Sequence, residues 1–520
     1  MTSITNAVVR EMQVFIALIA MPVFGLAQQA VDEPLDEIIV TATRLQTTVR
    51  EAARSVSVVD QQHIQNGTQQ LALDEALAGV PGLYMQNRYN MAQDLRISLR
   101  GFGARSAFGI RGIKVIVDGI PETLPDGQAG VDSIDLGSAK SIQVIRGPSS
   151  SLYGNASGGV IVIESESGSK PPFIEARLAA GGLGFQKYQL KAGGKTGKFD
   201  YLLNVASQEL DGYREHSASE GTLFNGRFGI QLAEDDRLTF VLNSTDQPHA
   251  QDPGGINAVQ AEIDRKSARA ANLIYDAGEA LDQQRFGVVY QRDRAAGSLT
   301  IRNYYVWRDF SNFLPFESGG AVDLDRFFYG FGVQYTLADV LPEEFELMIG
   351  LDIDRQDDTR KRFDNMQGHV GPLRLDQREK VDSDGAFVQS RYLFNRHWDM
   401  TAGLRSDNIK FDVTDDYLID GDDSGRISFD QFSYSLGLNR KLERGVLFAA
   451  IGSSFETPTT TELANPDGSG GFNQSLEPQT AINYELGYKT GTEQLFFEIA
   501  VFHINLKNEL VPFELPDSPG

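Results

Sequence analysis

Alternating apolar and polar residues are the main pattern of the chain from about residue 171 to residue 508. Such stretches recur, with loops between and within them, at residues 173–193, 198–209, 222–245, 284–310, 326–356, 384–413, 427–456 and 480–508. A period of two places successive side chains on opposite faces of a β-strand, so each strand has one apolar and one polar face. Strands of about ten residues are long enough to cross a bilayer at a tilt. The pattern therefore predicts an antiparallel membrane β-barrel.

The alternative to a barrel is a soluble β-sandwich or propeller, which would show the same period. Apolar outer faces as persistent as these would aggregate in water, which disfavours a soluble fold. Long acidic loops on alternate connections also fit an outer-membrane barrel, which has short turns on one side and long loops on the other.

A different pattern covers residues 52–168, where strand and helix signals are mixed. The short stretches Val56–Val59, Ile113–Val117 and Ile142–Ile145, rich in Val and Ile, are typical of strands, and Leu71–Ala78 resembles a helix. A unit of about 120 residues has ordinary domain size. We therefore expect an α+β domain ahead of the barrel.

The first residues of the chain have the pattern of an export signal. Met12–Phe24 is mostly apolar, and the small residues Gly25 and Ala27 follow it where a signal peptidase would cleave. The stretch is too short to be a stop-transfer helix. An amphipathic N-terminal helix is the alternative, but we expect residues 1–27 to be a signal peptide and the protein to be exported.

Composition excludes several classes of function. The chain has 520 residues with 47 basic and 71 acidic side chains, so its formal net charge is −24. This balance argues against a nucleic-acid partner, because phosphate binding needs an excess of Lys and Arg. The absence of Cys excludes disulfides, thiolate metal sites and cysteine nucleophiles. No apolar run reaches about 18 residues, so we expect no transmembrane helix.

Six motifs occur along the chain, at residues 36–44, 97–103, 115–121, 141–161, 454–458 and 476–487. The first resembles the energy-coupling TonB box of TonB-dependent outer-membrane receptors, the next three resemble the plug of that family, and the last two resemble its late barrel strands. Each motif alone is weak, and the ordered set carries the resemblance. The stretch 102–128 is most similar to receptors of the ferric-dicitrate type.

The resemblance implies a plug domain inside a barrel of nominally 22 strands, in the outer membrane of a Gram-negative bacterium. The implied units are a periplasmic segment at 28–50, a plug at 51–170 and a transmembrane barrel at 171–520. The alternating pattern accounts for about fifteen strands, fewer than the 22 or so of plugged transporters. Residues 515–520 are loop-like, whereas family barrels end on a strand with a terminal aromatic residue. We therefore expect an incomplete barrel whose C-terminal strands are missing.

Energy coupling is implied for residues 36–42. The outer membrane has no ATP, so the plug must be moved by a pull from the periplasm, which the resemblance assigns to TonB and its inner-membrane energising complex. An extended segment can add as a strand to the edge of a partner sheet through main-chain hydrogen bonds. A disordered tail with incidental β-propensity is the alternative. The residues expected to bind TonB are Asp36, Glu37, Ile38, Ile39, Val40, Thr41 and Ala42.

Arginines are concentrated in the plug of this acidic chain. Guanidinium groups bind carboxylates and oxyanions bidentately, so one interpretation is that these arginines face an anionic iron chelate. The residues then expected at the plug apex are Arg88, Tyr89, Asn90, Arg105, Phe108 and Arg111. The other interpretation is that each arginine pairs with a barrel carboxylate and seats the plug. We favour the latter for Arg100 and Arg146, since the resemblance implies a plug–barrel lock with Glu456 and Glu485.

One acidic loop is similar to the start of a calcium loop. Asp420, Asp422 and Ser424 alternate as calcium ligands do, with a glycine at the sixth position. The twelfth position is Gln431 instead of the bidentate Glu that the motif requires, so a solvated loop is favoured over a cation site. No His pair has a zinc spacing. We expect no cofactor.

These observations predict an energy-coupled outer-membrane receptor that takes up a ferric chelate, either a siderophore or ferric citrate. Other metal chelates, a vitamin or an oligosaccharide are alternative ligands, because loops set specificity and fold does not. A passive porin or adhesin would not explain the N-terminal domain or the coupling segment, and a secreted β-rich hydrolase would be soluble without detergent. We expect no enzymatic activity, and we expect a monomer whose partners are TonB, the ligand and outer-membrane lipid.

Overall fold

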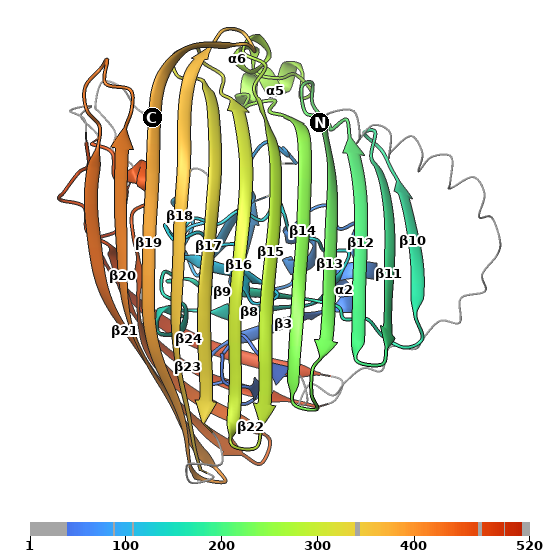
Figure 1. The fold of residues 1–520 in the computed structure, drawn as a ribbon, viewed down its shortest axis with the longest axis vertical. Coiled ribbons are helices and arrows are strands. Elements are labelled where there is room, and N and C mark those ends of the chain that lie inside the picture. The colour runs from blue at the N-terminus through green and yellow to red at the C-terminus, as the bar shows by residue number, and fades with distance from the viewer. Residues whose placement is uncertain are drawn as a thin grey trace.

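A fifteen-stranded antiparallel sheet curves around a smaller five-stranded sheet in the computed structural model (Figure 1). The structure describes residues 39–86, 89–106, 109–337, 344–465, 471–492 and 495–511. Within these residues, no helix is both long enough and apolar enough to cross a membrane.

The large sheet is built from strands that follow one another in sequence. Its order runs from β10 to β24 without a crossover, and each strand pairs with the next in antiparallel fashion. The strands are β10 (Phe173–Ala180), β11 (Gln186–Thr196), β12 (Phe199–Leu210), β13 (Ser219–Gln231), β14 (Asp236–Gln251), β15 (Gly278–Arg294), β16 (Gly297–Phe313), β17 (Ala321–Leu337), β18 (Phe345–Asn365), β19 (Val370–Asn395), β20 (Trp398–Asp415), β21 (Gly425–Leu442), β22 (Gly445–Glu456), β23 (Gln479–Gly491) and β24 (Phe496–Lys507). Their number agrees with the alternating pattern of the sequence.

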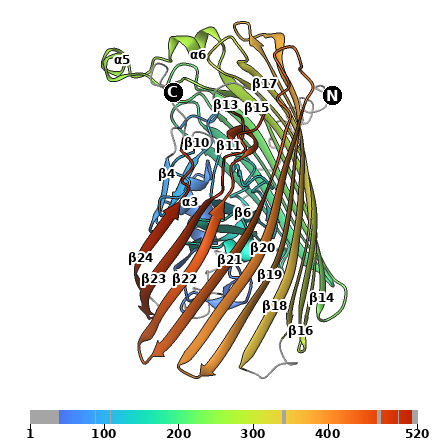
Figure 2. The same cartoon turned by 90° about the vertical axis from the view of Figure 1, so that its left-hand side faces the viewer.

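The two sides of the large sheet differ in the length of their connections (Figure 2). On one side, β11 and β12 are joined by residues 197–198, and β15 and β16 by residues 295–296. On the other side, residues 252–277 join β14 to β15 and include α5 (Ala258–Ile263) and α6 (Ala270–Ile274). Outer-membrane barrels have short periplasmic turns and long extracellular loops. The side that carries α5 and α6 is therefore the extracellular side.

Burial along the strands is the reverse of that in a soluble protein. Trp307 of β16 is 47% exposed and Tyr329 of β17 is 39% exposed, and both rings stack with Tyr305 on the outer face. Asn204 and Asp358, in the opposite phase of their strands, are fully buried. An apolar outer face around a polar interior is the arrangement that lipid outside and a filled lumen inside require. The predicted fold class is confirmed.

The smaller sheet lies within the curve of the large one. Its order is β3-β8-β9-β6-β7, in which β6 and β9 are parallel and the other pairs are antiparallel. The elements of this region are β1 (Ile39–Val40), β2 (Thr47–Thr48), β3 (Val56–Asp60), α2 (Gln61–Asn66), α3 (Leu73–Leu77), β4 (Leu83–Gln86), β5 (Arg96–Leu99), β6 (Ile113–Val117), β7 (Ile120–Pro121), β8 (Ala139–Arg146), α4 (Ser150–Tyr153) and β9 (Gly159–Ser165). The strands and helix expected here from the sequence overlap β3, α3, β6 and β8.

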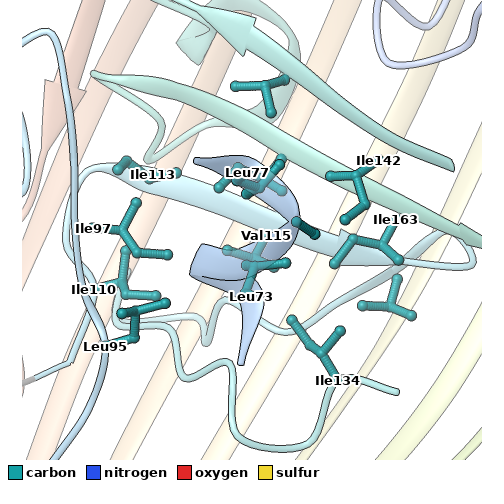
Figure 3. Close-up of a cluster of buried hydrophobic side chains, with 14 of the residues drawn as sticks. Leu73, Leu77, Leu95, Ile97, Ile110, Ile113, Val115, Ile134, Ile142 and Ile163 are labelled. Carbon is teal, nitrogen blue, oxygen red and sulfur yellow. The ribbon is translucent and has the colours of Figure 1, made fainter. Parts of the chain in front are cut away.

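Branched aliphatic side chains fill both faces of β6. Ile113 and Val115 are fully buried in the core that packs between the small sheet and α3 (Figure 3). Ile116, on the opposite face of the strand, belongs to a second cluster that contains Met348 and Phe387 of the barrel wall. The apolar residues of β6 are thus buried on both sides, against the core of the plug and against the barrel.

The start of β9 permits a sharp test of the packing of the small sheet. Gly159 has a φ of +144°, and a Cβ at this position would lie 2.1 Å from the carbonyl oxygen of Ile145. We predict that Gly159→Ala destabilises the plug by about 2–3 kcal/mol, because β9 must move away from β8. Thermal unfolding of the detergent-solubilised protein measures the change. Gly79→Ala is the control, since a Cβ there meets nothing within 4 Å; equal melting of both variants would contradict the prediction.

Candidate ligand face and coupling segment

Arg105 lies in the plug loop after β5 and joins the plug to two barrel carboxylates. Its Nη2 donates to Oε1 of Glu456 at 2.5 Å, and its Nη1 donates to Oε1 of Glu462 at 2.6 Å. Glu456 ends β22, and Glu462 lies in the 3-10 turn η2 (Thr460–Glu462) of the extracellular loop that comes next. Arg105 therefore pairs with barrel carboxylates, as expected for an arginine that seats the plug in the barrel. Its side chain nevertheless remains 15% exposed.

Arg111 is buried more deeply and lies among carboxyl groups. Arg111 is 2% exposed, so the surrounding residues shield it from solvent at the apex. Burial raises the pKa of the neighbouring Asp94 and Asp126 carboxyl groups, and the charge of Arg111 opposes this rise. Asp94 also accepts a hydrogen bond from the backbone N–H of Gly109 at 2.7 Å. The structure therefore places Arg111 inside the plug–barrel contact, not on the surface that meets the extracellular space.

The loop before β5 is attached to the extracellular connection between β14 and β15. Nδ2 of Asn90 and Nε2 of Gln93 donate to the two carboxylate oxygens of Asp252 at 2.7 and 3.1 Å. The adjacent Tyr89 is 66% exposed and has a φ of +50°. Tyr89 is thus accessible from the extracellular side, whereas Asn90 is engaged with the barrel. Two further residues expected at the apex lie outside the described residues, namely Arg88 and Phe108.

Arg100 and Glu485, which the sequence assigns to a plug–barrel lock, are brought together by the structure. Nη2 and Nη1 of Arg100 donate to Oε1 and Oε2 of Glu485 at 2.8 and 2.9 Å. Ser55 of the plug donates to the same carboxylate at 2.5 Å. The side chains of Arg100 and Glu485 are 4% and 2% exposed. Bidentate geometry with an additional hydrogen bond is what a buried ion pair needs to offset its desolvation.

The partners of Arg146 and Glu456 differ from those expected. Nη2 of Arg146 donates to Oε1 of Glu498 in β24 at 2.6 Å, while Glu456 accepts from a different plug arginine. The reason is the position of the strands. Glu485 of β23 is already occupied by Arg100, and Arg146 at the end of β8 reaches the next strand along the sheet. The charge pattern of a single strand does not show which neighbouring strand offers the carboxylate.

One contact between plug and barrel was not predicted from the sequence. Lys489 of β23 is fully buried, and its Nζ donates to the carbonyl oxygens of Val49, Ala52 and Arg54 at 2.9, 2.8 and 2.6 Å. Three carbonyl oxygens satisfy all three N–H groups of the ammonium. The alternation of β23 could have indicated this contact. Lys489 follows Glu485 by four residues, so both side chains lie on the same, inward face of the strand.

The coupling segment is folded against the plug where the structure describes it. Its β1 pairs with β2 as a short hairpin. Oε1 of Gln143 in β8 accepts hydrogen bonds from the backbone N–H groups of Thr41 and Ala42, at 3.0 Å each. Val40 is fully buried. Residues 36–38, also expected to bind TonB, lie outside the described residues.

Arg44 connects the turn of this hairpin to the barrel wall. Its Nη2 donates to Oδ2 of Asp352 at 2.9 Å, and its guanidinium lies 4.5 Å from the ring centre of Tyr153. Asp352 of β18 also pairs with Arg302 of β16 and Arg405 of β20, each two strands away. The segment that would be pulled from the periplasm is therefore tied to the barrel as well as to the plug.

The acidic loop after β20 forms hydrogen bonds within itself. Oδ1 of Asp422 accepts from the backbone N–H of Ser424 at 3.0 Å, and Oγ of Ser424 accepts from the backbone N–H of Asp415 at 3.0 Å. In the part of the chain that the structure describes, no three His, Asp or Glu side chains gather as a metal ion would require. The solvated-loop interpretation of Asp420–Ser424 accounts for these contacts.

Comparison with known families agrees with this architecture. Residues 219–520 match the family described as "TonB dependent receptor-like, beta-barrel", and residues 48–160 match the "TonB-dependent Receptor Plug Domain". The chain belongs to the TonB-dependent receptor family. It is therefore a transporter of the Gram-negative outer membrane and not an enzyme, and it moves a ligand across that membrane with the help of TonB.

Relatives of this chain are named for different ligands. The rhizobactin receptor of Rhizobium meliloti (strain 1021) is 22% identical over 97% of this chain and 78% of its own length. The vitamin B12 transporter BtuB of Vibrio vulnificus (strain CMCP6) is 23% identical over 92% of this chain and 72% of its own length. The unliganded ferric citrate transporter FecA superimposes with a TM-score of 0.76 at 20% identity, covering 90% of this chain and 72% of that chain. The structural likeness shows the fold and leaves the ligand open.

The pair of Arg100 and Glu485 yields a prediction on plug seating. We expect Glu485→Gln to destabilise the docked plug by about 3–5 kcal/mol, because it leaves the Arg100 guanidinium buried without a counter-charge. The protease sensitivity of the plug, with the barrel intact, reports the change. The double variant Arg100→Met with Glu485→Met removes both charges and should be more resistant than Glu485→Gln alone. Equal resistance of Glu485→Gln and the unmodified receptor would show that the pair does not hold the plug.

Proposed function

We propose that this receptor takes up an anionic ferric chelate, such as ferric citrate or a siderophore with free carboxylates. The observation that carries the proposal is the Arg105 guanidinium on the extracellular side of the plug, bound to two carboxylates. A guanidinium with carboxylate partners can exchange one of them for a carboxylate of the ligand with the same geometry. The names of two similar proteins, the rhizobactin receptor and the ferric citrate transporter, support an iron chelate.

In this proposal Arg105 and Tyr89 belong to the ligand face. They come from the two loops that flank β5, and both retain exposure to the extracellular side. Glu462, the more exposed partner of Arg105 at 29%, is part of the extracellular loop after β22. A ligand carboxylate that replaces Glu462 on Arg105 therefore releases that loop as it binds. Ligand binding and loop rearrangement become one event.

A vitamin is the second candidate ligand, because the vitamin B12 transporter is as similar in sequence as the rhizobactin receptor. A neutral vitamin would bind through apolar contacts and neutral hydrogen bonds. Its affinity would not depend on the charge of Arg105, so the two candidates predict different results for the same substitution.

We infer that residues 36–42 bind TonB by strand addition. Support comes from the short hairpin of β1 and β2, in which the second half of this segment lies. The hairpin is held by two residue pairs, by Gln143 and by Arg44, so it is the first folded unit that a pull on these residues reaches.

Loss of the Arg105 charge tests the ligand class. We predict that Arg105→Ala weakens binding of ferric citrate to the purified receptor by about 10–100-fold, the effect of one charge-assisted hydrogen bond or more. Arg237→Ala is the control, because Arg237 pairs with Asp200 near the periplasmic turns. Titration calorimetry gives both affinities. Unchanged affinity of Arg105→Ala for ferric citrate would remove Arg105 from the ligand face, and charge-independent binding of vitamin B12 would favour the second candidate.

A substitution in the coupling segment tests its role. Proline lacks the backbone N–H that a paired strand donates, so we predict that Ile39→Pro abolishes uptake of radio-iron-labelled ferric citrate while binding at the cell surface is retained. Ile39→Ala keeps the N–H and should transport. Both variants are compared at equal receptor abundance. Normal uptake by Ile39→Pro would mean that TonB does not pair with this residue.

A further inference from the structure

A cavity of about 810 Å³ lies between the plug and the barrel wall formed by β13–β20. Its volume is within the range of small-molecule sites, about 300–1,000 Å³. Its lower rim is the β15–β16 turn, where Asp293 and Arg294 are exposed. Its upper end reaches Leu124 of the plug and Phe455, the neighbour of Glu456. The cavity therefore extends from beneath the ligand face to the periplasmic side.

One wall of this cavity is the turn between β1 and β2. The residues of that wall are Thr41, Ala42, Arg44, Leu45 and Gln46. They overlap and directly follow the residues proposed to bind TonB. Displacement of the segment toward the periplasm therefore removes a wall of the cavity and widens it on the side where the ligand must leave.

Two cations of the cavity are incompletely paired. Lys114 of β6 is 9% exposed, and among the described residues its Nζ has neither a hydrogen bond nor an ion pair. Nε and Nη1 of Arg44 lack hydrogen-bond partners, while its Nη2 is bound to Asp352. Burial lowers the pKa of Lys114, and the charges of Asp354 and Asp352 oppose this shift. Buried cationic donors without partners are groups that an oxyanion satisfies.

The charged residues that line the whole cavity balance, with seven cations and seven carboxylates. The cluster around Asp352 in contrast has four cations and three carboxylates, and these residues are Arg44, Lys114, Arg302, Arg405, Asp352, Asp354 and Asp407. In a region of reduced dielectric, one uncompensated positive charge attracts an anion more strongly than it would in water. The ligand class that fits is therefore a small chelate with carboxylate or other oxyanion groups.

We propose that this cavity is a transit site, in which Lys114 and Arg44 bind an anionic chelate on its way from the ligand face to the periplasm. The inference rests on the proposed function, because it takes the ligand to be anionic, and it adds the route along β13–β20. Arg44 lies in the β1–β2 turn, directly after the residues proposed to bind TonB, so a pull on them displaces it. Displacement therefore widens the exit and removes one of the two cations that hold the ligand, so opening and release occur together.

Surface binding and uptake of radio-iron-labelled ferric citrate distinguish the transit site from the ligand face. Lys114→Gln removes the charge, and we expect the maximal uptake rate to fall about tenfold, the factor for one lost charge-assisted hydrogen bond. The Kd at the cell surface should not change. Lys114→Arg retains the cation and should restore most of the rate. Lys195→Gln, which removes an exposed lysine of β11, is the matched control and should transport like the unmodified receptor.

A second pair of variants tests the route by filling part of the cavity with a larger side chain. Thr300 of β16 lines the cavity, whereas the adjacent Ile301 does not. Thr300→Trp places an indole in the space and should lower uptake without affecting surface binding. Ile301→Trp adds the same side chain on the other face of the strand and should leave the uptake rate unchanged.

The possible outcomes separate the two proposals. Unchanged uptake in both Lys114→Gln and Thr300→Trp, at equal receptor abundance, overturns the transit site. Reduced uptake in Lys114→Gln that Lys114→Arg does not restore, together with a lower melting temperature, assigns Lys114 a structural role and also overturns it. If the receptor without any substitution binds and takes up no ferric chelate, the proposed function is contradicted, and that result does not depend on the variants.

Discussion

The pairing of buried charges between the plug and the inner wall of the barrel is the constraint on which the rest of the structure depends. Lipid requires an apolar outer face on every strand, so the polar phase of each strand points into the lumen. The plug fills that lumen and must supply counter-charges, as Asp132 does for Arg308 and Glu122 does for Arg285. An isolated charge in this position would cost several kcal/mol. The position of the plug is therefore set by electrostatic complementarity as much as by apolar packing.

The exposure of these pairs divides them into two kinds. Arg100 and Glu485 are shielded from water and have a bidentate geometry, which suits a permanent attachment. Arg105 and Glu462 lie at the extracellular end, where water and a ligand can compete for each partner. Because this pair is partly exposed, water screens it more than it screens the buried pair. The same chemical pair can thus hold the plug at one level and respond to a ligand at another.

Sequence patterns predicted those features that the solvent imposes on neighbouring residues. The large sheet was predictable because lipid and lumen demand opposite polarity at successive positions, and the stretch Ile113–Val117 indicated a strand of the plug. The partner of Arg146 was not predictable, because the choice between Glu485 and Glu498 depends on which strand lies beside β8. Lys489 was missed because its acceptors are main-chain carbonyls, which have no signature in the sequence. Local environment is encoded locally, whereas partners across the lumen are fixed by the tertiary arrangement.

The hairpin of β1 and β2 also has a mechanical consequence. Ile39 and Thr48 are paired at its open end, so tension applied at Ile39 breaks the hydrogen bonds one after another, as in unzipping, instead of loading them all together. The next strand, β3, lies at the edge of the smaller sheet, whereas β9 has a partner on each side. Resistance to extension therefore increases along the chain from its coupling end. Under the proposed coupling at residues 36–42, the hairpin would therefore be extracted before the core of the plug is loaded.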